Sequence, residues 1–337
     1  MTINLNIGVW NYYEEFSRNR LFDPKSYLRD DNLYYPFLCL KNESLKKGFN
    51  MDTLDMYPLD HFDVFIFFDI PRIDLLDKIK SINQNLFLVI FESEIIKPDN
   101  WDKNLHKYFK KIFTWNDDWV DQKKYIKMFW PQKIPEDIPF SKKDKLCVMI
   151  SGNKTNRDSR ELYSERLNAI RYFEKNHPND FDLYGTNWDI RTFRTFHRLN
   201  RFHFIRKILA EKRPSYRGVV NKKIDILSKY KFSFCYENAK DITGYITEKI
   251  FDSFFAGTIP IYLGAPNVKD FIPESTFIDK GHFSNYDELY DFIVKIDEDK
   301  YDEYIENIRQ FLKSDKIRNF SAEFWADTLL KNIISSM

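Results

Sequence analysis

The sequence predicts an α/β protein built from two similar halves, because buried strands alternate twice with helical patterns. The continuous apolar runs Asp63–Asp69 and Leu86–Phe91 are typical of strands covered on both faces, and residues 72–83 between them have helical spacing. A second alternation begins at Leu146–Ile150, after the proline-containing stretch 130–144. Strand–helix–strand alternation favours parallel sheets covered by helices. We therefore expect two Rossmann-like domains.

The remaining predicted elements complete this alternation. A chain of 337 residues is long enough for two domains, since one domain usually has about 100–200 residues. We place the first domain at 1–140, the second at 141–315, and a C-terminal helix in 316–337 that we expect to pack back toward the first domain. Further strands are expected at 3–10, 111–115, 232–236, 259–263 and in a segment ending at Gly185, and further helices at 158–174, 222–229, from 247 onward, at 301–312 and at 321–334.

The composition excludes several classes of protein. A hydrophobic content of 43% is enough for buried cores, and a net charge of +1 gives no global attraction to nucleic acid. Cys39, Cys147 and Cys235 are too few and too far apart for a disulfide framework or a zinc site, which favours a reducing compartment. We expect no signal peptide, because the first ten residues lack a basic region followed by a long apolar stretch, and the sequence has no apolar run of about 18 residues. We expect a cytoplasmic protein that is at most peripheral to a membrane.

Residues 229–266 combine the polar groups of a binding site with the elements that would hold them. The strand Phe232–Tyr236 ends in Glu237 and Asn238, a helix begins near Thr247, and a second strand ends at Gly264. Thr247 is suited to cap the helix, and the start of a helix binds anions through free N–H groups. This order brings Asn238, Tyr245, Glu248 and Lys249 to the carboxyl edge of a sheet, where ligands bind.

The same segment resembles the donor-site signature of the family 10 α-1,3/4-fucosyltransferases. That signature is an aromatic-Glu-Asn, a short loop, Tyr-x-Thr-Glu-Lys, a helix, and Pro-aliphatic-aromatic-x-Gly. It corresponds here to residues 236–238, 245–249 and 259–264. Weaker likenesses extend the resemblance to about half the chain, at residues 91–93, 113–118, 151–153, 159–163, 182–185 and 270–273.

The resemblance implies a GT-B architecture, which has two Rossmann-like domains with a cleft between them and C-terminal helices. It implies an inverting, metal-independent transfer of fucose from GDP-fucose to a glycan that contains N-acetylglucosamine or glucose, such as lipopolysaccharide or another surface glycan. The first domain would bind this oligosaccharide or glycolipid acceptor, and the second would bind the nucleotide sugar. No cofactor would be required, and we expect no membrane anchor, which favours the microbial or viral type.

The resemblance also implies roles for individual residues. Glu92, at a strand end, would be the catalytic base, and Glu94 is the alternative base or an acceptor-binding residue that would face the same side if the strand continued. Arg160 and Lys249 would neutralise the diphosphate. The remaining donor-binding candidates are Asn153, Asn238, Tyr245, Thr247 and Glu248. Taken singly, each of these residues is more often structural or part of a surface ion pair.

Two other functions and one charged segment stay open. The same scaffold could use another nucleotide-6-deoxysugar, or the chain could be a non-catalytic glycan- or nucleic-acid-binding protein. The basic, aromatic segment 191–217 is first interpreted as a solvated amphipathic helix, second as a peripheral contact with anionic lipid or a charged glycan, and third as a nucleic-acid contact, which we do not expect. A metal site is not indicated, because Asp117 and Asp118 are adjacent and the histidines lack ligand spacing.

Overall fold

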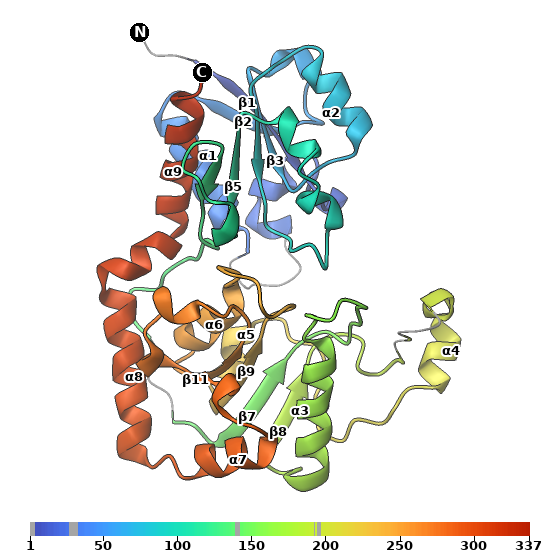
Figure 1. Cartoon of the computed structure of the whole chain (residues 1–337), viewed down its shortest axis with the longest axis vertical. Helices are drawn as coiled ribbons and strands as arrows, with labels where there is room; N and C mark the ends of the chain where they lie inside the picture. The colour runs from blue at the N-terminus through green and yellow to red at the C-terminus, as the bar shows by residue number, and fades with distance from the viewer. Residues whose placement is uncertain (1–3, 27–32, 139–141, 192, 194–196) are drawn as a thin grey trace. The chain divides into compact units, whose positions relative to one another are not determined.

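The computed structural model describes residues 4–26, 33–138, 142–191, 193 and 197–337, and it confirms the predicted fold class with two parallel sheets (Figure 1). The chain divides into two compact units. The first combines residues 1–134, 243–245 and 315–337, and the second combines residues 135–242 and 246–314. The expected boundary between residues 140 and 141 falls outside the described residues.

The first unit is built on a six-stranded parallel sheet in the order β2-β1-β3-β4-β5-β6. The order reverses between β1 and β3, and such a reversal is where open α/β sheets bind ligands, outside the carboxyl ends of the strands. The strands are β1 (Asn6–Asn11), β2 (Asn50–Thr53), β3 (Val64–Phe68), β4 (Leu86–Val89), β5 (Lys111–Thr114) and β6 (Tyr125–Lys127), and the helices are α1 (Tyr35–Lys46), α2 (Ile73–Lys80) and α9 (Ala322–Ile334).

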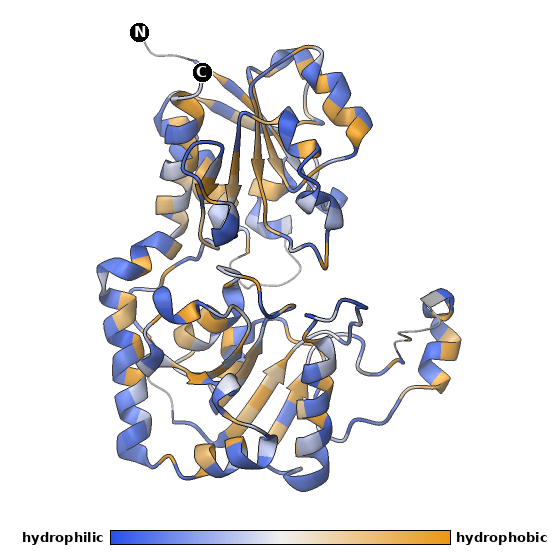
Figure 2. Cartoon of the chain, viewed as in Figure 1, coloured by the Kyte–Doolittle hydropathy of each residue, from blue (hydrophilic) through white to orange (hydrophobic). Residues whose placement is uncertain are grey.

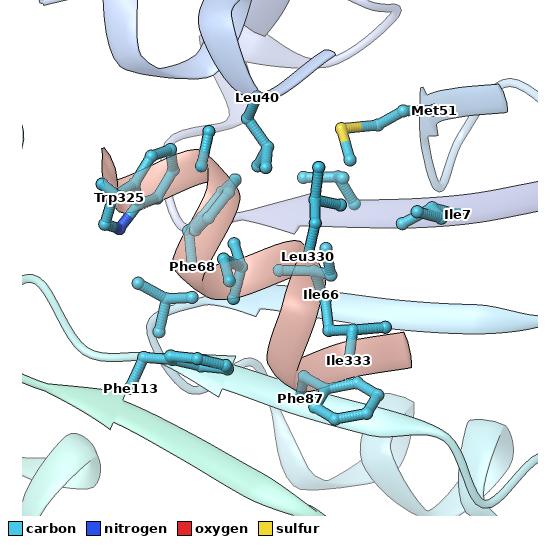
Figure 3. Close-up of a cluster of buried hydrophobic side chains, with 14 of the residues drawn as sticks. Ile7, Leu40, Met51, Ile66, Phe68, Phe87, Phe113, Trp325, Leu330 and Ile333 are labelled. Carbon is cyan, nitrogen blue, oxygen red and sulfur yellow. The ribbon is translucent and has the colours of Figure 1, made fainter. Parts of the chain in front are cut away.

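The C-terminal helix α9 is part of the core of the first unit (Figure 3). Its apolar stripe includes Trp325, Leu330 and Ile333, which pack among Ile66 and Phe68 of β3 and side chains of α1. The stripe follows the helical period of 3.6 residues, so burying it places the helix along one face of the sheet. On the other face, α2 contributes its own buried leucine and isoleucine, and Figure 2 shows the strands between as the most hydrophobic part of the unit.

The second unit has a five-stranded parallel sheet in the order β11-β10-β9-β7-β8, so its order reverses between β7 and β9. Its strands are β7 (Lys145–Ile150), β8 (Phe181–Tyr184), β9 (Tyr230–Tyr236), β10 (Ile259–Leu263) and β11 (Ile278–Asp279). Its helices are α3 (Tyr163–Asn176), α4 (His203–Ile208), α5 (Lys223–Leu227), α6 (Glu248–Phe255), α7 (Tyr286–Val294) and α8 (Glu298–Lys313).

Two predicted elements have different bounds in the structure. The helix expected at 158–174 begins only at Tyr163, because the Asp158 carboxylate binds both the backbone and the side chain of Arg160 and holds that stretch as a loop. The strand expected at 86–91 ends at Val89. The sequence did not predict α1, α7, β2, β6 or β11, which are short or lack a clear apolar period, whereas α4 lies within the segment that was interpreted as an amphipathic helix.

The basic segment 191–217 forms an arm of the second unit, of which residues 192 and 194–196 lie outside the described residues. Its helix α4 stands away from the sheet of its own unit (Figure 1). Phe204 and Ile208, one helical turn apart, are 74% and 64% exposed. The arm therefore presents apolar as well as basic side chains to solvent. Within the described part of the chain, every helix is too short or too polar to cross a bilayer.

Candidate functional site

A buried aspartate fixes the chain around Glu92 in the first unit. Asp69 follows β3 with a left-handed backbone, φ +65°, and its Oδ1 accepts hydrogen bonds from three donors. These are the backbone N–H of Phe91 at 2.8 Å, that of Glu92 at 3.1 Å and Nδ2 of Asn100 at 2.6 Å. Left-handed aspartate is uncommon and concentrates at functional sites. Asp69 thus sets the direction in which the chain leaves β4.

The side chain of Glu92 is partly exposed and is oriented by a tyrosine. The hydroxyl of Tyr13 donates to Oε1 of Glu92 at 2.9 Å, and Asn100 Nδ2 also donates to the Glu92 carbonyl at 3.1 Å. Burial raises the pKa of Tyr13, and the Glu92 carboxylate raises it further, so this hydroxyl stays a donor. A carboxylate held in this way has the chemistry needed to take a proton from a sugar hydroxyl.

Glu94 does not lie on a continued strand. The chain turns after β4, where the backbone N–H groups of Ile96 and Lys97 both donate to the Ser93 carbonyl. Glu94 was expected to face the same side as Glu92 only if the strand continued through both residues. The strand ends at Val89, so that expectation is wrong.

A second buried acid organises the start of α6 in the second unit. Glu237 follows β9 and has no solvent exposure. Its Oε1 accepts from the backbone N–H of Thr247 at 2.8 Å, and its Oε2 accepts from Thr247 Oγ1 at 2.7 Å and from Lys249 Nζ at 3.0 Å. Thr247 occupies the N-cap position as expected, but its side chain makes no capping hydrogen bond because the hydroxyl is directed to Glu237.

Lys249 and Glu248 remain charged despite their surroundings. Burial alone would lower the pKa of Lys249, but Glu237 and Glu248 outweigh burial and raise it. Burial would raise the pKa of Glu248, but Lys249 and Lys223 outweigh it and hold that pKa at about 2. The start of α6 therefore presents a permanent cation beside a permanent carboxylate, an arrangement that can meet a diphosphate and sugar hydroxyls together.

Arg166 is a buried cation of this site that the sequence analysis missed. Its Nη2 donates to the carbonyls of Tyr236 and Glu237 at 2.6 and 2.7 Å and to Oδ1 of Asn238 at 3.1 Å. It reaches the end of β9 from α3 and so fixes Asn238 there. Several arginines occur between residues 157 and 171, and only its position on the buried face of α3 distinguishes this one.

The other predicted donor residues divide into two groups. Arg160 lies beside Asn238, since Leu162 N–H donates to the Asn238 carbonyl and Lys240 N–H donates to the Arg160 carbonyl. Two guanidinium nitrogens of Arg160 hold Asp158 at 3.0 and 2.8 Å and lower the pKa of Asp158. Asn153, by contrast, donates its amide to two carbonyls in the loop after β8 and stabilises that loop.

Tyr245 belongs to the first unit, in which residues 243–245 are packed. Its ring is buried 4.6 Å from that of Trp115, so the ring faces protein and not an open site. The preceding Gly244 has φ +76°, and a Cβ there would lie 2.2 Å from the Trp115 carbonyl oxygen. Only glycine allows this approach.

The adjacent acids Asp117 and Asp118 do not form a metal centre in the structure. Asp117 pairs with Lys127, and the Asp118 backbone is held by Asn116. Across the described ranges there is no group of three His, Cys, Asp or Glu residues that could hold a metal ion.

Comparison with known proteins places this geometry in a family. Residues 140–324, more than half of the chain, match the model of the C-terminal part of glycosyltransferase family 10 (fucosyltransferase). The chain belongs to glycosyltransferase family 10. The match covers both Glu237 and the whole of α6, so the residues described above at the start of α6 lie within the matched region.

Individual relatives are similar over shorter stretches. An α-(1,3)-fucosyltransferase of Helicobacter pylori is 51% identical over 75 residues, which is 22% of this chain and 15% of that protein. An α-(1,4)-fucosyltransferase of Arabidopsis thaliana is 39% identical over 80 residues, or 23% of this chain and 20% of that protein. The chain thus spans a fifth or less of the length of these relatives.

Among solved structures, the fold is similar to that of an α1,3-fucosyltransferase. The TM-score is 0.55, with 18% identity over 98% of this chain and 90% of the other. A DNA-modifying β-glucosyltransferase is similar with the same TM-score and 12% identity, over 98% of this chain and all of the other. These likenesses agree with the expected GT-B fold and show the fold alone.

The pKa of Asp69 gives a prediction about stability. Burial, and then the charge of Glu92, raise it to about 7, although the three N–H donors act in the opposite direction. Because the folded state binds the Asp69 proton more tightly than the unfolded state does, the free energy of unfolding is highest below about pH 4. It falls as the pH rises from there through about 7. Asp69→Asn keeps the accepting oxygen and should remove this decline, which is on the order of a few kcal/mol.

Denaturant unfolding between pH 4 and pH 8 would measure this effect, with the exposed Asp60→Asn as the matched control. An Asp69→Asn variant whose stability declines with pH as steeply as that of the wild type would contradict it.

Proposed function

We propose that the chain transfers fucose from GDP-fucose to a hydroxyl of an N-acetylglucosamine- or glucose-containing glycan, with inversion at the transferred carbon. The observation that carries this proposal is the charged Lys249 at the start of α6, anchored by buried Glu237. Membership of family 10 supports the reaction class, and the name of the Helicobacter relative supports the α-1,3 linkage. An α1,3-fucosyltransferase of similar fold has been crystallised with GDP-fucose, which supports the donor.

In this proposal the leaving diphosphate is stabilised by protein cations and by the first N–H groups of α6. Lys249 supplies a point charge, and the helix start supplies aligned dipoles. Arg160 can grip two phosphate oxygens, but it must exchange Asp158 for the phosphate to do so. Glu248 and Asn238 would bind donor hydroxyls, while Asn153 would support the site through the loop that it holds.

Glu92 is the proposed base. It would take the proton of the acceptor hydroxyl while that oxygen attacks the sugar carbon from the face opposite the diphosphate. The bond to the diphosphate breaks, and its electron pair leaves with GDP. The hydrogen bond from Tyr13 supports this role because it fixes the carboxylate while a sugar hydroxyl approaches.

Glu92→Gln tests the proposed base. Glutamine keeps the size of the side chain but cannot accept the proton, so transfer from GDP-fucose to N-acetyllactosamine should fall by roughly 10²–10⁴-fold. GDP affinity, measured by calorimetry, should be retained. Glu303→Gln is the control and should keep the transfer rate, because Glu303 is an exposed acid that pairs with Lys300 on the surface of α8.

The outcome also decides among the alternatives. Undiminished transfer by the Glu92→Gln variant would remove Glu92 as the base. A heat of binding with UDP- or dTDP-sugars but not with GDP-fucose would indicate a different donor. The absence of a heat of binding with every nucleotide tested would favour a non-catalytic binding protein.

We also infer that the arm at 197–213 contacts an anionic lipid surface. Phe204 and Ile208 are exposed, and the same segment carries five cations, at Arg198, Arg201, Arg206, Lys207 and Lys212. Apolar side chains rimmed by Lys and Arg are the pattern of peripheral attachment to anionic headgroups. The acceptor would then be a glycolipid at the same surface.

The wild-type protein should co-sediment with phosphatidylserine-rich vesicles and be released by salt, because the attraction is partly electrostatic. A Phe204→Ser, Ile208→Ser variant should bind several-fold more weakly. Phosphatidylcholine vesicles and a Tyr57→Ser variant are the controls. Equal sedimentation of all variants, or with both lipids, would count against this contact.

A further inference from the structure

A cavity of about 680 Å³ lies within the first unit, at the point where the strand order of its sheet reverses. Its walls include Trp10 of β1, Thr53 at the carboxyl end of β2 and Ile70, which follows β3. Small-molecule pockets usually enclose about 300–1,000 Å³, and in open α/β sheets they form at such reversals. Both the size and the place of the cavity are those of a ligand site.

The cavity walls include four aromatic side chains, two of which are well exposed to solvent. Trp10, Tyr12, Tyr13 and Phe16 contribute rings, and Tyr12 and Tyr13 are 41% and 43% exposed. The rings of Tyr12 and Tyr13 lie 5.0 Å apart at 68°. Ring faces carry negative potential and attract the slightly positive C–H groups of a sugar ring. Aromatic walls interspersed with carboxylates are suited to a molecule that has both C–H faces and hydroxyl donors.

Tyr13 joins this cavity to Glu92. It lines the cavity, and its hydroxyl donates to Oε1 of Glu92 at 2.9 Å. A saccharide in the cavity would therefore lie one side chain away from the proposed base. The Tyr13–Glu92 hydrogen bond thus connects the cavity with the proposed reaction.

The charges of the cavity select against anions. Four carboxylates line it, at Glu14, Asp55, Asp74 and Asp99, against two cations at Arg72 and Lys97. Both cations are paired with acids of the same lining, Arg72 with Asp74 at 3.1 Å and Lys97 with Asp99 at 3.1 Å. Among the described residues, Glu14 and Asp55 have no ion-pair partner. The lining thus has an excess of two negative charges.

We propose that this cavity is the acceptor subsite and that it takes an uncharged saccharide while rejecting carboxylated, sulfated or phosphorylated ones. The aromatic rings hold the sugar faces, the carboxylates accept its hydroxyl hydrogen bonds, and the unpaired Glu14 and Asp55 repel an anionic substituent. The proposal deepens the proposed function and rests on it for the identification of the ligand as an acceptor.

Saccharide binding without donor tests this subsite separately from the transfer reaction. N-acetyllactosamine and its 6-sulfated form are titrated into the full chain, with saturation-transfer NMR as the readout. The neutral sugar should bind at least roughly fivefold more tightly than the sulfated one, as expected for repulsion by partly exposed charges. The Glu14→Gln, Asp55→Asn double variant should bring the two affinities together.

Tyr12→Ala should weaken binding of the neutral sugar roughly tenfold. The matched control is Tyr57→Ala, because Tyr57 is 45% exposed in the same unit but lies outside the cavity lining. Equal affinity in Tyr12→Ala and Tyr57→Ala, or a preference for the sulfated sugar in the wild type, would overturn the subsite. Failure of the proposed function would give a different result: the saccharides would bind with the expected preference, but calorimetry would detect no binding of GDP.

Discussion

The Glu237 carboxylate is fully buried at the end of β9, and the N–H of Thr247, its hydroxyl and the Lys249 ammonium all donate to it. A buried charge is tolerated only when it is paired and hydrogen-bonded, so these three donors cannot be placed independently of the acid. Gly264 at the end of β10 belongs to the same constraint, because a Cβ there would lie 2.5 Å from Cγ of Glu237. The start of α6 depends on this carboxylate, which together with Glu248 also keeps Lys249 charged.

The first unit uses a comparable device. Asp69 and Glu237 follow the corresponding strands β3 and β9, each beside the reversal of its sheet's order. Each acid is almost or wholly buried and receives three hydrogen bonds. Asp69 fixes the segment that carries Glu92, and Glu237 fixes the segment that carries Lys249. These two segments supply the proposed base and the proposed phosphate cation. A buried acid therefore holds each of the two groups that the proposed reaction needs.

The sequence predicted those features that depend on local pattern. Apolar runs identified β3, β4, β9 and β10, and the ordered signature from Tyr236 to Gly264 identified the family. It did not predict that Asp69 and Glu237 are buried acids that anchor the neighbouring segments, although Glu237 belongs to that signature, because in sequence both are polar residues at strand ends. It also missed Arg166, whose partners are backbone carbonyls more than 60 residues away. Such contacts depend on tertiary packing, which periodicity does not contain.

The most direct measurement of the central claim is a calorimetric titration of GDP into Lys249→Met and, as the control, Lys269→Met, whose lysine pairs with Glu274 on the surface. Lys249→Met should lose GDP affinity by roughly tenfold or more, because a charge-assisted contact with the diphosphate is removed. Lys269→Met should bind GDP as the wild type does. Wild-type affinity in Lys249→Met would contradict the assignment of the start of α6 as the diphosphate site.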